Sequence, residues 1–541
     1  MDIDKINRCK HNAKPKTQKK NRNHKNHLTS HSKNAIINAT HICAKINRLL
    51  AENTRRKNYH AEKAYSHRPA GSTVPTGCGN AGSAETTADT TAVVETVETE
   101  PEETLDIDVQ DYGGYTVNIA LAGNWSFTDF VAEELTGESV SDAVYNTNQS
   151  VSELLNVNFT VDNQSGKASS GQGTGYKLFD NMVMAGTNDY EFGSIGCYDV
   201  CTLAYNGRIL DLNTMPNIDL SKSWWDPKAN EHLSIRDKMF FSTGDIGILD
   251  NDCTYCILFN KQVITDYGLD NPYELVENNE WTYDKMYEMA DVVDSDTDGD
   301  GKQTVTDNYG FIIWQDSVIG MLHSSGGRCA TIGEDGKISL TLNTEQNIDV
   351  LTEWLSMNTE PIAFFLGGAT DDEVHGIFTG NRGLFYTRYV RAASWFRDME
   401  TDFGLLPYPK WDASQKDYCN TMHAYGTSYI CVPVTAEDPA RAGAVIEALA
   451  YYGKQLITPA YYDTTLKGKY FRDEESAAML DIIFSSRFFD IGMYYQIGGY
   501  NEKVIQMMQQ GNTDFVSMYA KNETAALKKL EEINTAYAAM E

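Results

Sequence analysis

Residues 115–121 have the sequence YTVNIAL, in which apolar side chains alternate with polar or small ones. Such alternation over a short run predicts a β-strand with one buried face. Helical spacing of apolar residues follows over 139–155, alternation returns over 157–161, and a second helix and a third strand are expected over 176–184 and 190–195. The order strand, helix, strand, helix, strand predicts an α/β fold with a parallel sheet covered by helices on both faces.

Ligands of such sheets bind beyond the carboxyl ends of the strands, at the points where the strand order reverses. Asn124 and Trp125 come directly after the first expected strand. We therefore expect both residues to lie where a ligand binds.

A second unit begins near residue 254 with a short apolar run over 255–259. Strands and helices continue to alternate after it. The further expected elements are a helix over 281–293, strands over 311–314 and 383–386, a helix over 390–399, a strand over 429–434 and a helix over 439–452. The chain ends on an amphipathic helix, whose apolar stripe is Leu527, Leu530, Ile533, Tyr537 and Met540.

Six short motifs resemble those of the extracellular solute-binding proteins of bacterial ABC importers, in the sugar-binding class. The motifs are Gly207–Asn213, Trp224–Pro227, Leu258–Lys261, Trp281–Met286, Gly404–Lys410, and Pro439–Gly443 together with Glu447 and Ala448. Each motif is short, but their order and spacing are shared as a set. The likeness covers about residues 115–541.

The resemblance implies a two-lobed periplasmic-binding-protein fold of type II, with the ligand trapped in the cleft between the lobes. The first lobe would comprise 115–255 and 428–460, and the second 256–427 and 461–541. The resemblance implies a monomer that binds a carbohydrate, closes about a hinge and delivers the ligand to an ABC permease. It implies no catalysis, and the architecture alone does not establish the function.

A carbohydrate cleft should combine aromatic rings, which stack on sugar C–H faces, with amide, carboxylate or guanidinium groups, which bind hydroxyls. Asn124 and Trp125 fit this description. The other candidates, at expected strand ends or in loops, are Trp314, Gln315, Asp316, Tyr386, Arg388, Trp395, His423 and Tyr425. For any single ring, packing in the core is the alternative interpretation, and we expect Trp224 and Trp225 to pack at a helix start.

Residues 296–307 have the sequence DTDGDGKQTVTD, which resembles a calcium-binding loop. Ca²⁺ takes six to eight oxygen ligands, and carboxylates at loop positions 1, 3, 5 and 12, with Gly at position 6, wrap around one point. The expected ligands are Asp296, Asp298, Asp300, Asp307 and the carbonyl of Lys302. Asp stands at position 12 where Glu is usual, and an acidic solvated turn is the alternative.

The charge is divided unevenly along the chain. Residues 1–70 hold 17 Lys+Arg against 4 Asp+Glu, whereas the remainder holds 28 against 72, within a net charge of −31. The acidic body argues against nucleic-acid binding, because phosphates repel it. The basic front, within an expected leader over 1–77, has three interpretations: a basic arm, a disordered segment, or an artefactual start that replaces a signal peptide.

Residues 76–80, Thr-Gly-Cys-Gly-Asn, resemble the cleavage site of a bacterial lipoprotein, with Cys78 as the lipidated residue. The acidic segment 78–114, rich in Thr and Glu, is expected to form a tether. Pro75 replaces the expected Leu, and no apolar signal region lies upstream. The resemblance implies a protein anchored by lipid to the outer face of the cell membrane.

Other function classes find less support in the sequence. No run approaches the about 18 apolar residues of a membrane helix, and the spacing of the ten cysteines argues against zinc. No common catalytic motif is present. Three alternatives stay open: the same fold with a peptide, polyamine or polyol as ligand, a glycoside hydrolase, and a glycan-binding surface module without transport.

Overall fold

The computed structural model describes residues 103–166, 170–367, 369–462, 466, 471 and 473–540. These residues all belong to one compact unit. The expected leader, Cys78 and most of the expected tether lie outside the described residues.

The first lobe is built on a four-stranded sheet in the order β12-β3-β1-β2. Its strands are β1 (Tyr115–Ala122), β2 (Val157–Asn163), β3 (Phe192–Gly196) and β12 (Ser428–Cys431). Strand β1 pairs in parallel with β2 and β3, and β12 runs antiparallel to β3. The three strands expected near the start of the body are therefore neighbours in one sheet, joined by a strand from far along the chain.

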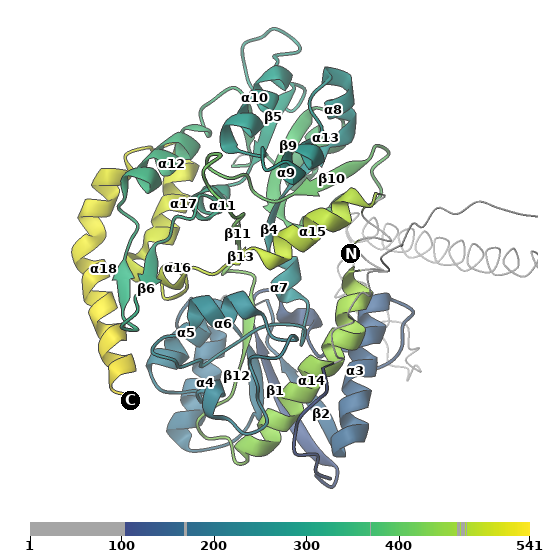
Figure 1. Cartoon of the computed structure of the whole chain (residues 1–541), viewed down its shortest axis with the longest axis vertical. Helices are drawn as coiled ribbons and strands as arrows, with labels where there is room; N and C mark the ends of the chain where they lie inside the picture. Colours follow the sequence, from purple (N-terminus) through teal and green to yellow (C-terminus); the bar gives the residue numbers. More distant parts are fainter. Residues whose placement is uncertain are drawn as a thin grey trace, which may run out of the picture. The chain divides into compact units, whose positions relative to one another are not determined.

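Alternate side chains of β1 face two separate apolar layers. Val117 and Ile119 belong to the layer beneath α3 (Ser139–Leu155) and α14 (Pro439–Pro459), which pack against each other (Figure 1). Ala120 belongs to the opposite layer, beneath α4 (Thr174–Ala185) and α5 (Cys197–Tyr205). Because successive side chains of a strand point to opposite faces, one strand can close both layers.

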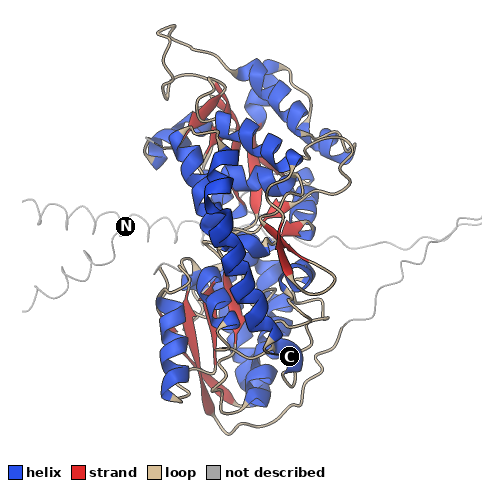
Figure 2. Ribbon diagram, turned by 90° about the vertical axis from the view of Figure 1, so that its left-hand side faces the viewer, coloured by secondary structure: helices blue, strands red, loops and turns tan. Residues whose placement is uncertain are grey.

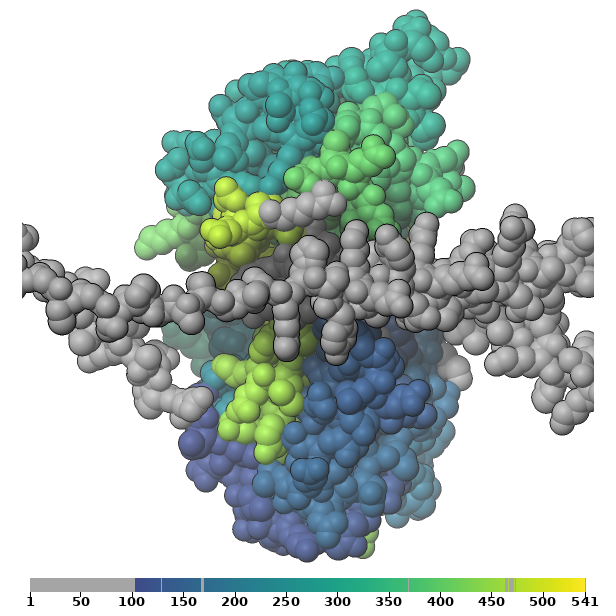
Figure 3. Space-filling view, turned by 90° about the vertical axis from the view of Figure 1, so that its right-hand side faces the viewer, coloured from purple at the N-terminus to yellow at the C-terminus, as the bar shows by residue number. Residues whose placement is uncertain are grey.

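The second lobe is built on a five-stranded sheet in the order β10-β4-β9-β5-β8. Its strands are β4 (Tyr255–Asn260), β5 (Tyr309–Ile313), β8 (Ala363–Phe365), β9 (Gly383–Tyr389) and β10 (Phe403–Leu406). Strand β5 is parallel to β8 and β9, whereas β4 is antiparallel to β9 and β10. Figure 3 shows the two lobes on another face, the first in purple and blue below and the second in teal and green above.

The remaining elements lie around the two sheets and near the chain crossings. The helices are α6 (Pro227–Leu233), α7 (Leu249–Asp252), α8 (Lys261–Tyr267), α9 (Pro272–Glu277), α10 (Tyr283–Val293), α11 (Ser317–Ser324), α12 (Glu345–Ser356), α13 (Asp371–Thr379), α15 (Glu475–Ser485), α16 (Ile491–Tyr494), α17 (Tyr500–Gln510) and α18 (Phe515–Ala538). Short strands are β6 (Ala330–Ile332), β7 (Ile338–Leu340), β11 (Asn420–Thr421) and β13 (Arg487–Phe488), and 3-10 turns are η1 (Ser126–Thr128), η2 (Leu212–Thr214), η3 (Val390–Phe396) and η5 (Ile497–Gly499).

Two expected elements differ from the structure. Residues 390–399 were expected to form a helix, but 390–396 form the 3-10 segment η3. The expected apolar stripe of the last helix is also shifted, because Leu527 is 52% exposed while Ala526 is buried. The small Ala526 side chain allows α18 to approach the backbone at Gly498, which has a positive φ of 61°.

Helix α18 contacts elements of both lobes, and Figure 2 shows it as the long helix in front. Its Lys529 Nζ donates to the hydroxyl of Tyr205 at 2.8 Å, and its Tyr537 ring lies 5.6 Å from Phe240. Both partners lie between β3 and β4 in the chain. The C-terminal helix therefore connects the lobes at a distance from the chain crossings.

A buried ionic cluster lies where the chain crosses between the lobes. Arg487 of β13 donates to Asp226 at 2.6 Å, and its guanidinium lies 3.3 Å from a carboxylate oxygen of Asp250. Asp226 caps α6, whereas Asp250 belongs to α7. One guanidinium thus joins three segments that are distant in sequence.

Trp224 and Trp225 are almost fully buried, as their expected role in packing requires. Each indole N–H donates to one carboxylate oxygen of Glu447 on α14, at 2.9 and 3.0 Å. Burial raises the pKa of Glu447 to about 7 although both hydrogen bonds favour its ionised form. This triad connects the start of α6 to the long helix of the first lobe.

Residues 103–114 fall within the expected tether, but they pack onto the first lobe. Leu105, Ile107 and Tyr112 contact its apolar layer, and the Tyr112 N–H donates to the Leu155 carbonyl at 2.9 Å. The packed body therefore includes residues before 115.

Within the described part of the chain, no helix is both long enough and apolar enough to cross a membrane.

Candidate functional site

A cavity of about 400 Å³ is lined by residues of both lobes. Its aromatic lining consists of Trp125, Tyr198, Tyr255, Trp314 and Tyr425. Its polar lining consists of Gln315, Asp316, Arg388, His423, Asn501, Glu502 and Gln509. Both the volume and the mixture of rings with a few polar groups are typical of a small-molecule site.

The ends of the strands position most of this lining. Trp125 is the third residue after β1, Tyr198 is the second residue of α5, which begins directly after β3, and Trp314 directly follows β5. Arg388 is the penultimate residue of β9, which is parallel to β5. The two sheets therefore present the carboxyl ends of their parallel strands to the same cavity, as expected for an α/β ligand site.

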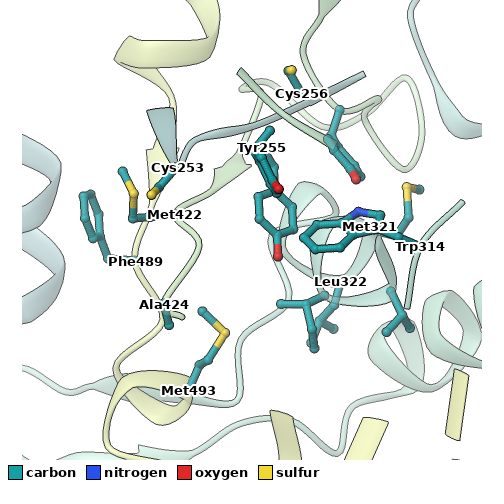
Figure 4. Close-up of a cluster of buried hydrophobic side chains, with 14 of the residues drawn as sticks. Cys253, Tyr255, Cys256, Trp314, Met321, Leu322, Met422, Ala424, Phe489 and Met493 are labelled. Atoms are coloured by element: carbon teal, nitrogen blue, oxygen red, sulfur yellow. The ribbon is translucent and has the colours of Figure 1, made fainter. Parts of the chain in front are cut away.

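The aromatic rings of the cavity are packed against one another. The Trp314 ring centre lies 5.5 Å from that of Tyr255, and Figure 4 shows the two side chains next to each other within a buried cluster. The His423 ring lies 5.2 Å from Trp125 and stacks on Tyr389 at 5.8 Å. Because each ring is held by others, the wall is formed by the protein alone and does not depend on a ligand.

Arg388 provides the positive charge of the cavity. Its Nε donates to the hydroxyl of Tyr386 at 3.2 Å. Its guanidinium carbon lies 4.7 Å from the ring centre of Trp314 and 5.4 Å from that of Trp395. Aromatic faces attract a cation, so these contacts fix the guanidinium without neutralising it.

Two carboxylates line another part of the cavity. The Nε2 atom of His423 lies 3.4 Å from a carboxylate oxygen of Asp316. Burial and the negative charge of Asp316 raise the pKa of Glu502, on α17, above its usual range.

Two polar atoms of this lining, His423 Nδ1 and Asn501 Oδ1, are buried without a hydrogen-bond partner in the described chain. A polar ligand could satisfy both atoms.

Most candidates from the sequence meet in this cavity. They are Trp125, Trp314, Gln315, Asp316, Arg388, His423 and Tyr425. Asn124 is not part of the lining, because its amide donates to the Tyr425 carbonyl at 2.6 Å. Tyr386 is fully buried behind Arg388, and Trp395 is 38% exposed and stacks on His375. Asn124, Tyr386 and Trp395 can therefore act on a ligand only through the lining residues beside them.

Sequence reasoning missed part of the lining. Tyr198 follows the third strand just as Trp125 follows the first, so the strand-end rule could have found it. Tyr255 begins β4, which is antiparallel to β9, so the start of β4 lies beside the end of β9, where Tyr255 is opposite Tyr389. Asn501 and Glu502 lie on α17, and no local signal indicates that this late helix borders the cavity.

A second cavity of about 380 Å³ shares Tyr198 with the first. Its lining includes Tyr205, Tyr495 and Lys529, and Lys529 lies 4.1 Å from the ring centre of Tyr205. The amide of Asn501 donates to the Tyr198 hydroxyl at 3.5 Å. Tyr198 therefore lies at the boundary of two neighbouring spaces, both rich in tyrosine or tryptophan.

The acidic loop 296–307 brings three of its carboxylates together. One oxygen each of Asp296, Asp298 and Asp307 lies within 4.8 Å of the others. The N–H groups of Gly301 and Gly299 donate to Asp296 and hold its pKa below the usual range. Asp300 is instead paired with Lys302, whose Nζ lies 2.7 Å away. Only part of the expected ligand set is therefore close together.

A His–Asp–Thr cluster bears on whether the protein is an enzyme. His323 lies 3.0 Å from the Thr421 hydroxyl and 3.1 Å from an Asp490 oxygen. All three side chains are at most 1% exposed, and the adjoining space is about 10 Å³. A nucleophile needs room for its substrate. This cluster therefore connects β11 to the start of α16 and offers no active site.

The cysteines of the described body are free, and all but Cys419 are buried. Burial raises the pKa of Cys253 and Cys256 well above the usual range for a thiol. Because a metal or a nucleophile needs the thiolate, these side chains act as apolar packing.

No protein-family model matches the chain, and no curated protein sequence resembles it significantly. Solved structures do. UspC of M. tuberculosis is 12% identical with a TM-score of 0.50, and the match covers 78% of this chain and all of UspC. The ABC substrate-binding protein Lmo0181 of Listeria monocytogenes, in complex with cycloalternan, is 12% identical over 79% of this chain and 99% of its own, with a TM-score of 0.48.

A cyclo/maltodextrin-binding protein complexed with maltotetraose is 13% identical, covers 78% of this chain and 96% of its own, and has a TM-score of 0.48. At these identities the likeness concerns the fold. The two sheets, the chain crossings and the match to UspC confirm the expected two-lobed periplasmic-binding-protein fold of type II.

Proposed function

We propose that the protein is the solute-binding component of an ABC importer and that its solute is an oligosaccharide. The aromatic cavity between the two lobes is the observation that carries this proposal. Rings such as Trp125 and Trp314 suit sugar faces, and the polar groups beside them suit hydroxyls. Two of the structural neighbours were solved in complex with oligosaccharides, cycloalternan and maltotetraose.

Because both lobes contribute to the cavity lining, ligand binding can favour closure of the lobes. Trp125 and Tyr198 belong to the first lobe, whereas Trp314 and Arg388 belong to the second. A ligand that contacts both sets has more contacts in a closed arrangement than in an open one, so it shifts the population towards closure. A permease that recognises only the closed form would then receive only loaded protein.

Isothermal titration calorimetry against neutral and acidic oligosaccharides tests this function. We expect saturable binding to at least one glycan, and a loss of about tenfold or more in the variant Trp314→Ala, because stacked rings provide much of the contact. Trp411→Ala is the matched control, since Trp411 stacks on Tyr283 and is not part of the lining. Tight binding to a peptide or polyamine, with no binding to any glycan, would reject the assignment.

Catalysis is not part of the proposal. A reducing-end assay on the same glycans should show no turnover. Sustained turnover that is lost on replacing Asp316 or Glu502, the two carboxylates of the cavity, would instead identify a glycosidase.

The proposal also includes the location and the oligomeric state. The protein would be a monomer, anchored by lipid on Cys78 to the outer face of the cell membrane. The acidic composition of the body suits such a place, because it reduces attraction to an anionic membrane surface. Mass spectrometry of the mature amino terminus should find a diacylated Cys78. A mature protein that begins upstream of Cys78 without lipid would contradict the anchor.

We also propose that loop 296–307 binds Ca²⁺ as a structural ion. The clustered oxygens of Asp296, Asp298 and Asp307 support the proposal. Calcium should raise the melting temperature relative to EDTA, and Asp307→Asn should remove this difference. Asp335→Asn is the control, because Asp335 lies in another acidic turn. Equal melting temperatures in calcium and EDTA would identify an acidic turn without a metal.

A further inference from the structure

The described chain contains three buried arginines, Arg388, Arg441 and Arg487, and each is 8% exposed. Arg441 donates to Glu191 at 2.9 Å, and Arg487 donates to Asp226 at 2.6 Å. Among the described residues, no carboxylate lies within ion-pair distance of Arg388. Burying a charge without a partner is strongly unfavourable, so the exception requires an explanation.

We propose that the ligand is an acidic sugar whose single negatively charged group binds the guanidinium of Arg388. This inference rests on the proposed function, because it specifies the class of glycan that the same cavity takes. The structure supports it in three ways: the burial of Arg388, its fixed orientation, and the balance of charge around it.

The orientation of Arg388 is set by neighbours that leave its terminal nitrogens available. Tyr386 accepts only the Nε–H, and the rings of Trp314 and Trp395 lie near the guanidinium carbon. Arg388 is itself part of the cavity lining. A fixed guanidinium fork matches the two oxygens of a carboxylate or sulfate, and little conformational entropy is lost when the pair forms.

The other charged groups of the cavity limit the ligand's charge. Asp316 lies 3.4 Å from His423 Nε2 and is not within ion-pair distance of Arg388. Glu502 is on α17, and the charges that shift its pKa are those of Asp316 and Lys503 and not that of Arg388. Arg388 is the one permanent cation among the described lining residues, so it matches a single negative charge, and Asp316 and Glu502 elsewhere in the lining would repel a phosphate dianion.

A carboxylate of a uronic acid and a sulfate ester share this chemistry, since both are monoanions with oxygens that a guanidinium can bind in pairs. The aromatic lining indicates that the rest of the ligand is a sugar. A neutral sugar could accept hydrogen bonds from Arg388, but it would leave the buried positive charge uncompensated.

The experiment compares acidic glycans with uncharged partners of the same skeleton by calorimetry at pH 7. The probes are cellobiouronic acid, which has one carboxylate, and its methyl ester, a xylotetraose with and without a glucuronate branch, and a galactose disaccharide with and without a sulfate ester. We expect at least one acidic member to bind at least about tenfold more tightly than its neutral partner. Preference within the first two pairs identifies a carboxylate, and preference within the third identifies a sulfate.

Three variants assign the preference to Arg388. Arg388→Met should abolish the preference, because the loss of affinity should be at least about tenfold larger for the acidic glycan than for its neutral partner. Arg388→Lys should retain part of it, because charge remains while the fork is lost. Arg397→Met, which removes an exposed arginine beside η3, should leave it unchanged. Melting temperatures of all variants establish that they are folded.

Equal binding of acidic and neutral partners, unaffected by Arg388→Met, would overturn this inference and leave the oligosaccharide function intact. Failure to bind any glycan, acidic or neutral, would overturn the proposed function and the inference with it.

Discussion

Two regions of the molecule bury an arginine to the same extent and use it differently. At the chain crossing, Arg487 contacts Asp226, Asp250 and the side chains of Asn251 and Thr254. In the cavity, Arg388 is surrounded by aromatic rings and one tyrosine hydroxyl. Arg487, which is paired with carboxylates of the chain, stabilises the fold. Arg388 is equally buried without such a partner, which indicates that a ligand provides the negative charge.

The largest expected effect on stability comes from replacing Arg487 at the chain crossing. Arg487→Met should lower the free energy of unfolding by about 3–5 kcal/mol, because it leaves buried carboxylates without their counter-ion. Chemical denaturation measured by circular dichroism provides the number. A matched variant, Arg487→Met with Asp250→Asn, should recover part of the loss. A change below about 1 kcal/mol for the single variant would show that the cluster is not structural.

Replacing Arg388 in the cavity should, in contrast, have little effect on the free energy of unfolding. Arg388→Met should leave the free energy of unfolding within about 1 kcal/mol of the unaltered protein, or raise it, because the variant removes an unpaired buried charge. The same denaturation experiment measures it. A destabilisation as large as that of Arg487→Met would mean that Arg388 stabilises the fold, as Arg487 does.

The buried carboxyls predict how stability depends on pH. The pKa of Glu447 is raised by burial to about 7, and that of Asp250 is raised to about 7 by burial that outweighs the nearby Arg487. Below their ordinary pKa values these groups are protonated whether the chain is folded or unfolded. Between about pH 4.5 and 7 the unfolded chain ionises first, so folding loses stability as pH rises.

Melting temperatures across pH 4.5 to 8 measure this effect, and Glu447→Gln should flatten the profile between pH 5 and 7. Glu353→Gln provides a comparison, since Glu353 is an exposed carboxyl on α12, away from the tryptophan pair. An unchanged profile in the Glu447 variant would contradict its role as a buried acid.

The smallest expected effect concerns the outer ring beside Arg388. Trp395→Ala should weaken binding of an acidic glycan by about two- to fivefold, because a partly exposed cation–π contact contributes about 0.5–1 kcal/mol. Calorimetry with the glycan that binds best measures it. A loss as large as that of Trp314→Ala would mean that Trp395 touches the ligand itself.

Sequence reasoning predicted the parts of this protein that depend on local pattern. The alternation around Val117 and the helical spacing after it predicted strands and helices that form the first sheet layer. The strand-end rule placed Trp125 and Trp314 in the lining. Local pattern is less informative where packing between distant segments determines which side chain is buried. In the last helix, Ala526 is buried and Leu527 is exposed because the helix packs closely against Gly498.

The same distinction holds within the cavity. Arg388 was predicted as a site residue from its place near a strand end, but its missing partner depends on every element packed around it. Asn501 and Glu502 reach the cavity through the packing of α17, which no local pattern determines. Residue type and strand order therefore predict where a ligand binds, and tertiary contacts are needed to infer its charge.

The central claim is that one oligosaccharide contacts both lobes in the cavity, and hydrogen–deuterium exchange with the best-binding glycan tests it most directly. We expect slower exchange in two segments together, 123–128 after β1 and 314–318 after β5. Slower exchange in only one of these segments, or only at a site elsewhere on the body, would contradict it.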